Sequence, residues 1–199
     1  GHGARLLLGD GAAPVVISQA LSQALYAGFI GLLGVERLAE LVLSRRNAAW
    51  AFARGGVEVG RGHYPTMAAL HTLFLGACVA EVRIFDRAFP GAIGWAALAL
   101  ALAAQGLRYW AIATLGERWT FRVLVLPAAP LIRSGPYRWL RHPNYLGVCG
   151  ELIGAWAWFG AWLAGPVATA AFVALMWRRV RIEDRALRAG SLPRPGTAP

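Results

Sequence analysis

Lysine is absent from this sequence, and cysteine, histidine and acidic residues are scarce. All 20 basic residues are arginine and outnumber the 10 acidic residues, which gives a formal net charge of +10. The two cysteines, Cys78 and Cys149, lie inside apolar runs, where cysteine usually serves as a small buried hydrophobic residue. The four histidines are scattered without the spacing of metal ligands. We therefore expect neither a disulfide nor a metal site.

Motifs of common soluble enzymes are also missing. The chain has no glycine-rich fingerprint for a dinucleotide and no suggestion of a Ser-His-Asp arrangement. Hydrophobic residues instead make up 57% of the chain and charged residues only 15%, far from the averages of soluble domains. Because the arginines lie between long apolar runs, the composition predicts a membrane protein and argues against nucleic acid as a partner.

Five apolar stretches predict an all-α, polytopic bundle of about five transmembrane helices. A span needs about 20 mostly apolar residues. The stretches cover residues 14–43, 64–85, 91–115, 143–164 and 166–177, the last continuing as a charged helix. Only Gly165-Pro166 separates the last two, a spacing that allows a C-terminal helical hairpin.

The arginines predict how this bundle is oriented. They gather in segments 44–63 and 115–142 and after residue 178, which fall on one side if five spans alternate. By the positive-inside rule that side is the cytoplasm. We therefore expect a multi-pass integral membrane protein with these segments in the cytosol.

A polar and aromatic run occupies residues 134–147, just before the fourth span. His142-Pro143 reads as a helix start, and the turn after it, with Asn144 and Tyr145, presents free backbone N–H groups that favour a carboxylate or phosphate. The aromatic side chains of the run suit a flat ring such as adenine. They equally suit an interfacial aromatic belt with arginines at lipid head groups.

A second polar cluster follows the fifth span, at residues 178–185. On a helix, one stripe is basic and suits contact with a membrane surface. It consists of Arg178, Arg181, Arg185 and Arg188. Arg179 and Glu183 lie one turn apart on another face, either as an ordinary ion pair or as part of a pocket. In a pocket, Arg179 suits an anionic oxygen, and Glu183 suits an ammonium group or a ribose hydroxyl.

Ionisable residues also lie within the predicted spans, where charges are costly and usually pair or line a cavity. They are Glu36, Arg37, Glu40, His71, Glu81, Arg108 and Glu151. Each serves either to hold helices together or to contact a substrate. Glu151, about two turns into the fourth span, is our candidate for a substrate contact. Gly150 and Gly154 have the spacing that lets a neighbouring helix approach closely.

Three motifs make the sequence resemble the isoprenylcysteine carboxyl methyltransferase family of integral membrane enzymes. They are Ser-Gly-Pro-Tyr at 134–137, Arg-His-Pro-Asn-Tyr-Leu-Gly at 141–147, and the helix from Arg179 through Glu183-Asp184. The resemblance covers about residues 115–188. Many family members have a Glu-Glu pair where this chain has Glu183-Asp184. Its main confusable relatives are membrane sterol reductases with a similar C-terminal layout, which use NADPH.

The resemblance implies S-adenosyl-L-methionine as cofactor, bound at the cytosolic face. The family's substrate-side arginine falls on Arg179, its expected catalytic residue. Family cofactor contacts fall on Arg122, Leu131, Ile132, Tyr137, His142, Pro143, Asn144, Tyr145 and Glu183. Together with the apolar stretches, the resemblance divides the chain into four parts. They are an N-terminal tail (1–13), helices 1–3 (14–114), a catalytic cofactor-binding region with helices 4 and 5 (115–188) and a flexible tail (189–199).

Residues 115–123 look more like bacterial members that methylate long-chain alkylpyrones or related phenolic lipids. We therefore expect an O-methyltransferase of a bacterial inner membrane that methylates a carboxylate or hydroxyl oxygen of a lipophilic acceptor. The acceptor is either isoprenylcysteine-like or an alkylpyrone or phenolic lipid. Two alternatives remain open at this point. One is an NADPH-dependent reductase of the sterol reductase type, and the other is a non-enzymatic module that binds anionic lipid through its arginines.

Overall fold

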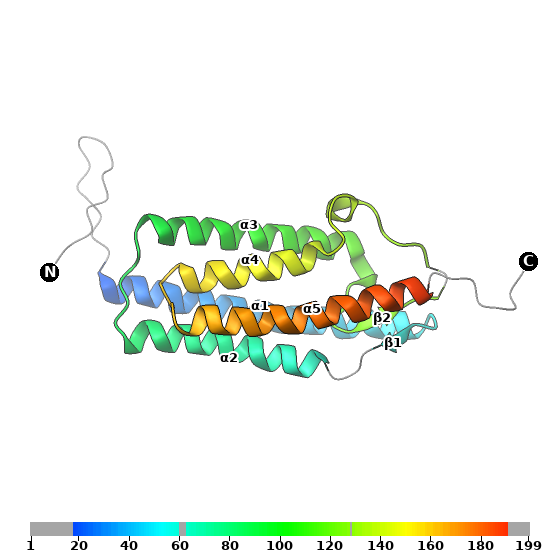
Figure 1. Cartoon of the computed structure of the whole chain (residues 1–199), viewed down its shortest axis with the longest axis horizontal. Coiled ribbons are helices and arrows are strands. Elements are labelled where there is room, and N and C mark those ends of the chain that lie inside the picture. The colour runs from blue at the N-terminus through cyan, green and yellow to red at the C-terminus, as the bar shows by residue number, and fades with distance from the viewer. Residues whose placement is uncertain (1–17, 60–62, 128, 191–199) are drawn as a thin grey trace, which may run out of the picture.

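The computed structural model describes residues 18–59, 63–127 and 129–190, and within them the chain is mostly helical. The predicted tails fall largely outside these residues. Five α-helices lie lengthwise beside one another (Figure 1). They are α1 (Gln19–Phe52), α2 (His63–Ile84), α3 (Ala92–Leu115), α4 (Pro143–Ala157) and α5 (Ala164–Gly190).

Short elements gather at one end of this bundle. Strands β1 (Val57–Val59) and β2 (Val123–Val125) pair antiparallel, with Glu58 opposite Leu124. The 3₁₀ turns η1 (Gly116–Arg118) and η2 (Gly135–Arg138) lie in the long link between α3 and α4. Each strand has only three residues, too few to show an alternating pattern, so the all-α prediction did not include this pair.

The first helix is longer than its apolar stretch predicted, because its last turns carry polar side chains that form hydrogen bonds with the link after α3. The prediction ended the stretch at residue 43, whereas α1 continues to Phe52. In the added turns, Asn47 donates from Nδ2 to the carbonyl oxygens of Gly116 and Trp119, at 3.1 and 2.8 Å. The Ser44 hydroxyl accepts from the backbone N–H of Phe121 at 2.8 Å. These bonds attach the link after α3 to α1.

The link between α4 and α5 lies earlier in the chain than predicted. Gly165 and Pro166 belong to the first turn of α5, where proline is tolerated because its missing N–H would be unpaired there. The chain turns instead at 158–163, where Gly160 has a φ of 70°. Glu81 of α2 accepts hydrogen bonds from the backbone N–H groups of Leu163 and Ala164, the latter at 2.7 Å. The carboxylate thus accepts hydrogen bonds from backbone N–H groups at the start of α5, and a helix N-terminus is a position that favours negative charge.

Within the residues that the structure describes, two helices are long and apolar enough to cross a membrane by length and composition, over Pro65–Ile84 and Ala92–Arg118. Many large apolar side chains of the helices also point outward, as a lipid-facing surface requires. They include Leu32, Leu38, Val42, Leu73, Leu102 and Val167. The arrangement of five spans stays a prediction.

Helices α3 and α4 pack most extensively against each other. At Gly154 an added Cβ would come within 2.7 Å of the backbone nitrogen of Ala101 and the carbonyl oxygen of Ala97. At Gly150 it would come within 2.9 Å of Ala104 Cβ. The small residues therefore permit close backbone approach, as their spacing predicted.

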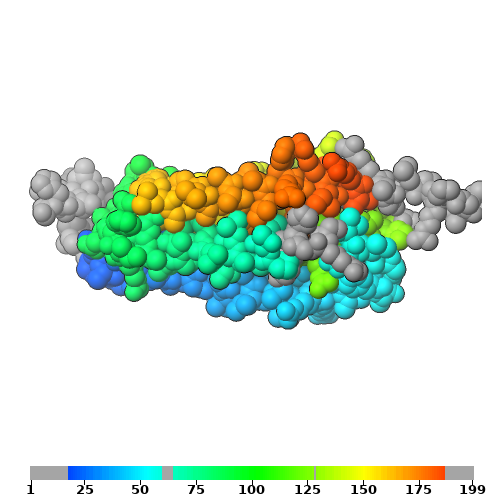
Figure 2. All heavy atoms as spheres, turned by 60° about the horizontal axis from the view of Figure 1, so that its bottom comes forward, coloured from blue at the N-terminus to red at the C-terminus, as the bar shows by residue number. Residues whose placement is uncertain are grey.

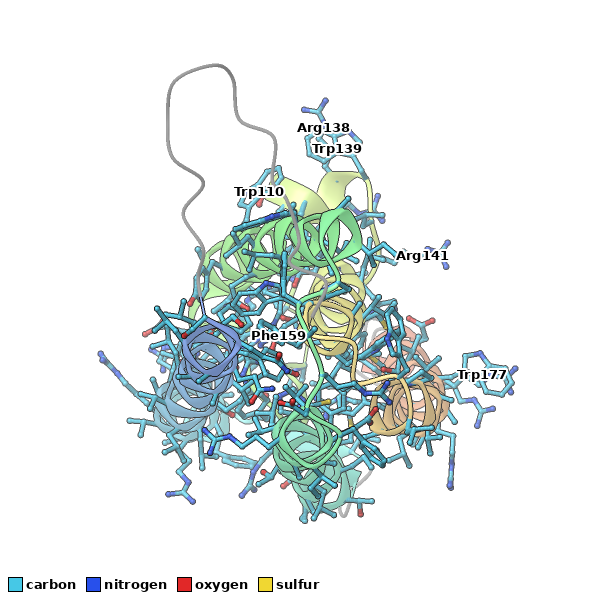
Figure 3. All side chains as sticks on the ribbon, turned by 90° about the vertical axis from the view of Figure 1, so that its left-hand side faces the viewer. Trp110, Arg138, Trp139, Arg141, Phe159 and Trp177 are labelled. Carbon is cyan, nitrogen blue, oxygen red and sulfur yellow. The ribbon has the colours of Figure 1, made fainter. Side chains whose placement is uncertain are left out.

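The other helices complete the bundle around an aromatic core. On one face of the molecule, α2 lies between α5 and α1 (Figure 2). Viewed from the end, Phe159 lies in the middle of the helices, while Trp177 and Arg141 point outward (Figure 3). The ring of Phe159 packs against Tyr26 with centroids 4.9 Å apart. This core closes one end of the bundle, opposite the end that carries the β pair.

Candidate functional site

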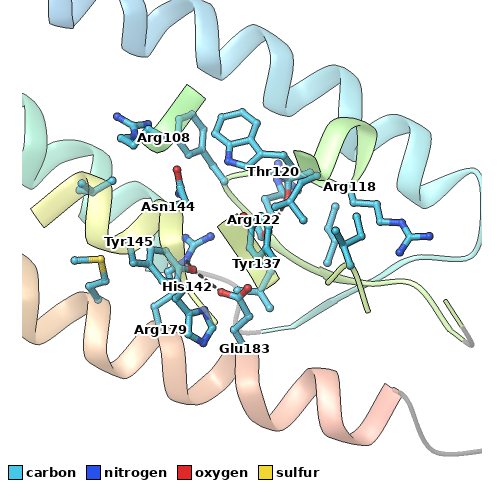
Figure 4. Close-up of a pocket in the computed structure, with 18 of the residues that line it drawn as sticks. Arg108, Arg118, Thr120, Arg122, Tyr137, His142, Asn144, Tyr145, Arg179 and Glu183 are labelled. Carbon is cyan, nitrogen blue, oxygen red and sulfur yellow. Dashed lines mark hydrogen bonds between the residues drawn. The ribbon is translucent and has the colours of Figure 1, made fainter. Parts of the chain in front are cut away.

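A cavity of about 1130 Å³ occupies the end of the bundle near the β pair (Figure 4). All five helices contribute to its wall, α3 through Arg108 and Leu115, together with much of the link from 116 to 142. The cavity therefore draws on both halves of the chain.

Three side chains form a hydrogen-bonded chain on the cavity wall between α4 and α5. Arg179 donates from Nε to the Tyr145 hydroxyl at 2.7 Å, and that hydroxyl donates to the Glu183 carboxylate at 2.5 Å. Arg179 is only 8% exposed. Among the described side chains, Arg179 and Glu183 make no direct ion pair, so the ordinary i,i+4 pairing gives way to a bridge through Tyr145.

The neighbouring arginines of α5 have a different environment. Arg178, Arg181 and Arg185 are exposed, and Arg181 lies over the Trp177 ring at 3.6 Å from its centroid. The helix thus separates a basic outer stripe from the cavity face of Arg179 and Glu183. Helical spacing predicted this separation.

His142 adds a second contact between the start of α4 and α5. Its Nε2 lies 3.1 Å from the Asp184 carboxylate, and its ring stacks on Tyr145 with centroids 5.5 Å apart. Pro143 is fully buried and does not line the cavity. The predicted row of free N–H groups is reduced here, because Pro143 has none and Tyr145 N–H donates to the His142 carbonyl oxygen at 3.1 Å.

The link after α3 supplies the outer wall of the cavity. Leu131, Ile132 and Tyr137 line it, as sequence analysis expected of cofactor contacts. Arg122 also lines it and pairs with Glu58 of β1 at 3.0 Å, although the Arg122 side chain is about half exposed. Burial raises the pKa of the Tyr137 hydroxyl, and the nearby charge of Glu183 raises it further, so Tyr137 stays protonated at neutral pH.

A buried ion-pair cluster closes the inner end of the cavity. Arg108, 1% exposed, binds the Glu40 carboxylate at 2.7 Å and the Glu151 carboxylate at 2.6 Å. Arg37 also pairs with Glu40, at 2.7 Å. Glu36 lies beside this group, paired with Arg37 at 3.2 Å and hydrogen-bonded to Gln105. The cluster joins α1, α3 and α4, as charges at membrane depth are expected to do.

Glu151 is therefore held away from the cavity. The lining includes Arg37 and Arg108 but not Glu151, whose carboxylate is paired with the Arg108 guanidinium. The structure brings together the other predicted residues that line the cavity, namely Arg122, Leu131, Ile132, Tyr137, His142, Asn144, Tyr145, Glu183 and Arg179. Pro143 and Glu151 lie outside this set.

Sequence analysis missed Ser44 and Asn47, which position the outer wall. Both are buried and bind backbone groups of 116–121, a segment that begins the cavity lining. In the sequence, Ser44 and Asn47 are simply polar residues just after an apolar stretch, a pattern that indicates a helix end. Their partners lie about seventy positions away, so no local pattern reveals them.

The arrangement suits a polar organic ligand beside an apolar one. Arg179 offers a cation, Glu183 an anion and Tyr137 a phenol on one wall. Leu38, Leu41, Met67 and Phe172 line the side formed by α1, α2 and α5. A cavity that combines charged side chains with an apolar side suits a ligand or ligands with both polar and apolar parts.

Comparison with known proteins places the chain in a family. Residues 97–189 match the isoprenylcysteine carboxyl methyltransferase (ICMT) family. The chain is 33% identical over 163 residues to the uncharacterized protein YpbQ of Bacillus subtilis, covering 82% of this chain and 96% of YpbQ. It is 27% identical over 154 residues to an uncharacterized protein of Haemophilus influenzae, covering 76% of this chain and 88% of that protein. No solved structure matches it significantly.

The family match spans α4, α5 and most of α3, and thus the helices that carry Arg108, Tyr145, Arg179 and Glu183. The motifs quoted from the sequence fall inside the matched range. The protein is therefore a member of the isoprenylcysteine carboxyl methyltransferase family of membrane methyltransferases.

Proposed function

We propose that this protein transfers a methyl group from S-adenosyl-L-methionine to an oxygen of a lipophilic acceptor at the cytosolic membrane face. The observation that carries the proposal is the Arg179–Tyr145–Glu183 chain on the wall of a large cavity. A cation suited to the acceptor and an anion suited to the cofactor thus lie close together, in a member of a methyltransferase family, which supports the proposal.

The residues present fit such a cofactor. Its amino and ribose hydroxyl groups are donors, for which the Glu183 carboxylate on the cavity wall is a suitable acceptor. The volume of about 1130 Å³ exceeds the 300–1,000 Å³ typical of single small-molecule sites, which leaves room for an acceptor head as well. We assign the cofactor to Arg122, Leu131, Ile132, Tyr137, His142, Tyr145 and Glu183 and to the backbone of Asn144, whose side chain points to the inner end of the cavity.

When bound, the cofactor supplies an already electrophilic methyl carbon. The protein therefore contributes mainly by aligning nucleophile and methyl group in a site shielded from water. Arg179 binds the negatively charged acceptor oxygen, and Tyr145 fixes the plane of its guanidinium through Nε. An acceptor carboxylate is ionised at neutral pH, so it needs no general base.

The membrane position follows from the charges around the cavity. Arginines 118, 122, 133, 138 and 141 all line it, at the end of the bundle where α5 carries its basic stripe. By the positive-inside rule we propose five spans in a bacterial inner membrane with this end in the cytoplasm. The cofactor then enters from the cytosol, and the outward leucines of the helices contact membrane lipids.

The test of Arg179 has a matched control one residue away. Arg179→Ala should reduce turnover by at least about a hundredfold, as expected when a buried charge-assisted contact is lost, while S-adenosylhomocysteine binding is largely kept. Arg178→Ala removes an exposed arginine of the same helix and should leave turnover within about twofold. The measurements are methyl transfer from labelled cofactor to host lipid extract, with product mass, and calorimetric cofactor affinity.

Calorimetry also separates the proposal from the alternatives. S-adenosylhomocysteine should bind and NADPH should not, and Glu183→Ala should weaken S-adenosylhomocysteine binding. Binding of NADPH alone would favour a reductase. Binding of neither would favour a lipid-binding module, and equal effects of Arg178→Ala and Arg179→Ala on transfer would remove Arg179 from the site.

A further inference from the structure

The inner end of the cavity contains polar atoms that the chemistry at Arg179 does not use. His71 of α2 lines the cavity and is 9% exposed, and its Nε2 has no hydrogen-bond partner among the described residues. Asn144 of α4 lines the same cavity, and its buried Oδ1 likewise has no partner in the described ranges. The Nε atoms of Arg37 and Arg108, which also line the cavity, are likewise buried without a partner among the described residues. Because buried polar atoms are usually hydrogen-bonded, this group of unpaired atoms on one cavity wall indicates a binding subsite.

The side chains of His71 and Asn144 belong to the part of the cavity that ends at Arg108. His71 is within electrostatic reach of Glu151, Arg37 and Arg108. Asn144 lies one helical turn before Gly147, against which the Arg108 side chain packs. In Figure 4 its oxygen points to the side of the cavity where Arg108 lies. One small group can therefore be held between α2 and α4 in front of the ion-pair cluster.

The charges behind this subsite select the kind of group. The cluster consists of three carboxylates and two guanidiniums, from Glu36, Glu40, Glu151, Arg37 and Arg108. The guanidiniums of Arg37 and Arg108, which line the cavity here, are already paired with these carboxylates, so neither offers an unpaired charge to an anion. Asn144 Oδ1 only accepts, so the group must donate a hydrogen bond. A neutral hydroxyl donates to Oδ1 and can still accept from a His71 Nε2–H.

We propose that His71 and Asn144 bind a hydroxyl group of the methyl acceptor other than the oxygen that is methylated. The inference rests on the proposed methyl transfer and narrows its substrate class to lipids whose head carries a second hydroxyl. Leu41 and Phe172 line the apolar side of the cavity beside them and suit the tail. An acceptor with a single oxygen function leaves both polar atoms unpaired, and sites built for a hydroxyl reject analogues that lack it.

Two matched lipids test this subsite by binding, without any need for turnover. Pentadecylresorcinol has two ring hydroxyls and pentadecylphenol has one, on the same tail. The full chain in lipid nanodiscs should bind the first at least about tenfold more tightly than the second. His71→Phe should bind the two about equally, and His71→Gln, which keeps a hydrogen-bonding group, should retain part of the preference.

Thr72→Val is the matched control, because the Thr72 hydroxyl lines the cavity but is already bonded to the Ala68 carbonyl oxygen at 3.0 Å. It should keep the wild-type preference. Equal wild-type affinity for the two lipids, or affinity for neither, overturns the proposal, and this comparison requires no variant to fold. A preference that survives in folded His71→Phe overturns it too. If the protein transfers methyl groups but shows no preference for the lipid with two hydroxyls, only the proposed subsite is wrong. If it shows that preference but does not bind S-adenosylhomocysteine, only the proposed function is wrong.

Discussion

The hydroxyl of Tyr145 joins α4 to α5 inside the cavity. It accepts from Arg179 and donates to Glu183, so one oxygen sets the positions of the two charged side chains that the proposed reaction uses. The motif around 141–147 predicted Tyr145 as a cofactor contact. Its bridging position adds a second role, because both partners lie on α5, more than thirty residues further along the chain.

Tyr145→Phe should slow methyl transfer while leaving the fold intact. A hydrogen bond to a charged group contributes about 1.5–3 kcal/mol, which corresponds to about tenfold to a hundredfold in rate. Turnover number and KM measured on the purified chain check this expectation. Tyr109→Phe, which alters a tyrosine exposed on α3, should have little effect. Unchanged turnover in folded Tyr145→Phe would show that Arg179 needs no bridge.

At the scale of elements, α3 and α4 form the most tightly joined pair. Gly147, Gly150 and Gly154 let α4 approach so closely that Arg108 and the backbone of α3 occupy the space of their missing side chains. This approach places the start of α4, with His142 and Tyr145, at a defined depth beside α5. The cavity geometry therefore depends on glycines that have no chemistry of their own.

Gly154→Ala should destabilise the bundle, because its Cβ would come within 2.7 Å of backbone atoms of Ala97 and Ala101. Overpacking of this kind costs about 1–3 kcal/mol. Gly31→Ala is the control, since a Cβ there meets nothing within 4 Å, and alanine in a helix is favoured by about 0.5–1 kcal/mol. In mixed detergent micelles, the free energy of unfolding should be lower than wild type for Gly154→Ala and higher than wild type for Gly31→Ala. Equal values would show that α3 can move away at no cost.

At the scale of the whole molecule, the bundle has two chemically different ends. The cavity, the basic stripe of α5 and the link from 115 to 142 share one end, while the link from α2 to α3 lies at the other (Figure 1). The outward-facing leucines and the buried ion-pair cluster lie between these two ends. Such a cluster contributes little net stability, but removing one partner leaves an uncompensated buried charge, so it holds α1, α3 and α4 in one arrangement.

The two ends should face opposite sides of the membrane. In a chain with Cys78→Ala and Cys149→Ala, we expect Arg185→Cys to react with an impermeant thiol reagent only in inverted vesicles. Ala88→Cys, an exposed position in the link from α2 to α3, should react only in right-side-out vesicles. The reason is the positive-inside rule applied to the arginine-rich end. Labelling of both positions from one side would contradict the spanning arrangement.

The sequence by itself determined the helical class, the approximate helix positions, the family and the separation of Arg179 and Glu183 from the basic stripe. Hydropathy, helical period and short motifs are local properties of the sequence, so they can be recognised without knowledge of the fold. The helix ends were less accurate, because the polar turns at Ser44 and Asn47 and the turn at Gly160 depend on distant partners.

Only the tertiary structure decided which polar residues meet. It withdrew Glu151 from the cavity by pairing it with Arg108, and it placed Tyr145 between Arg179 and Glu183. It also brought His71 of the N-terminal half to the cavity of the C-terminal motifs. Each outcome depends on contacts between side chains more than thirty positions apart, which are set by how helices pack and not by the order of residues within any one of them.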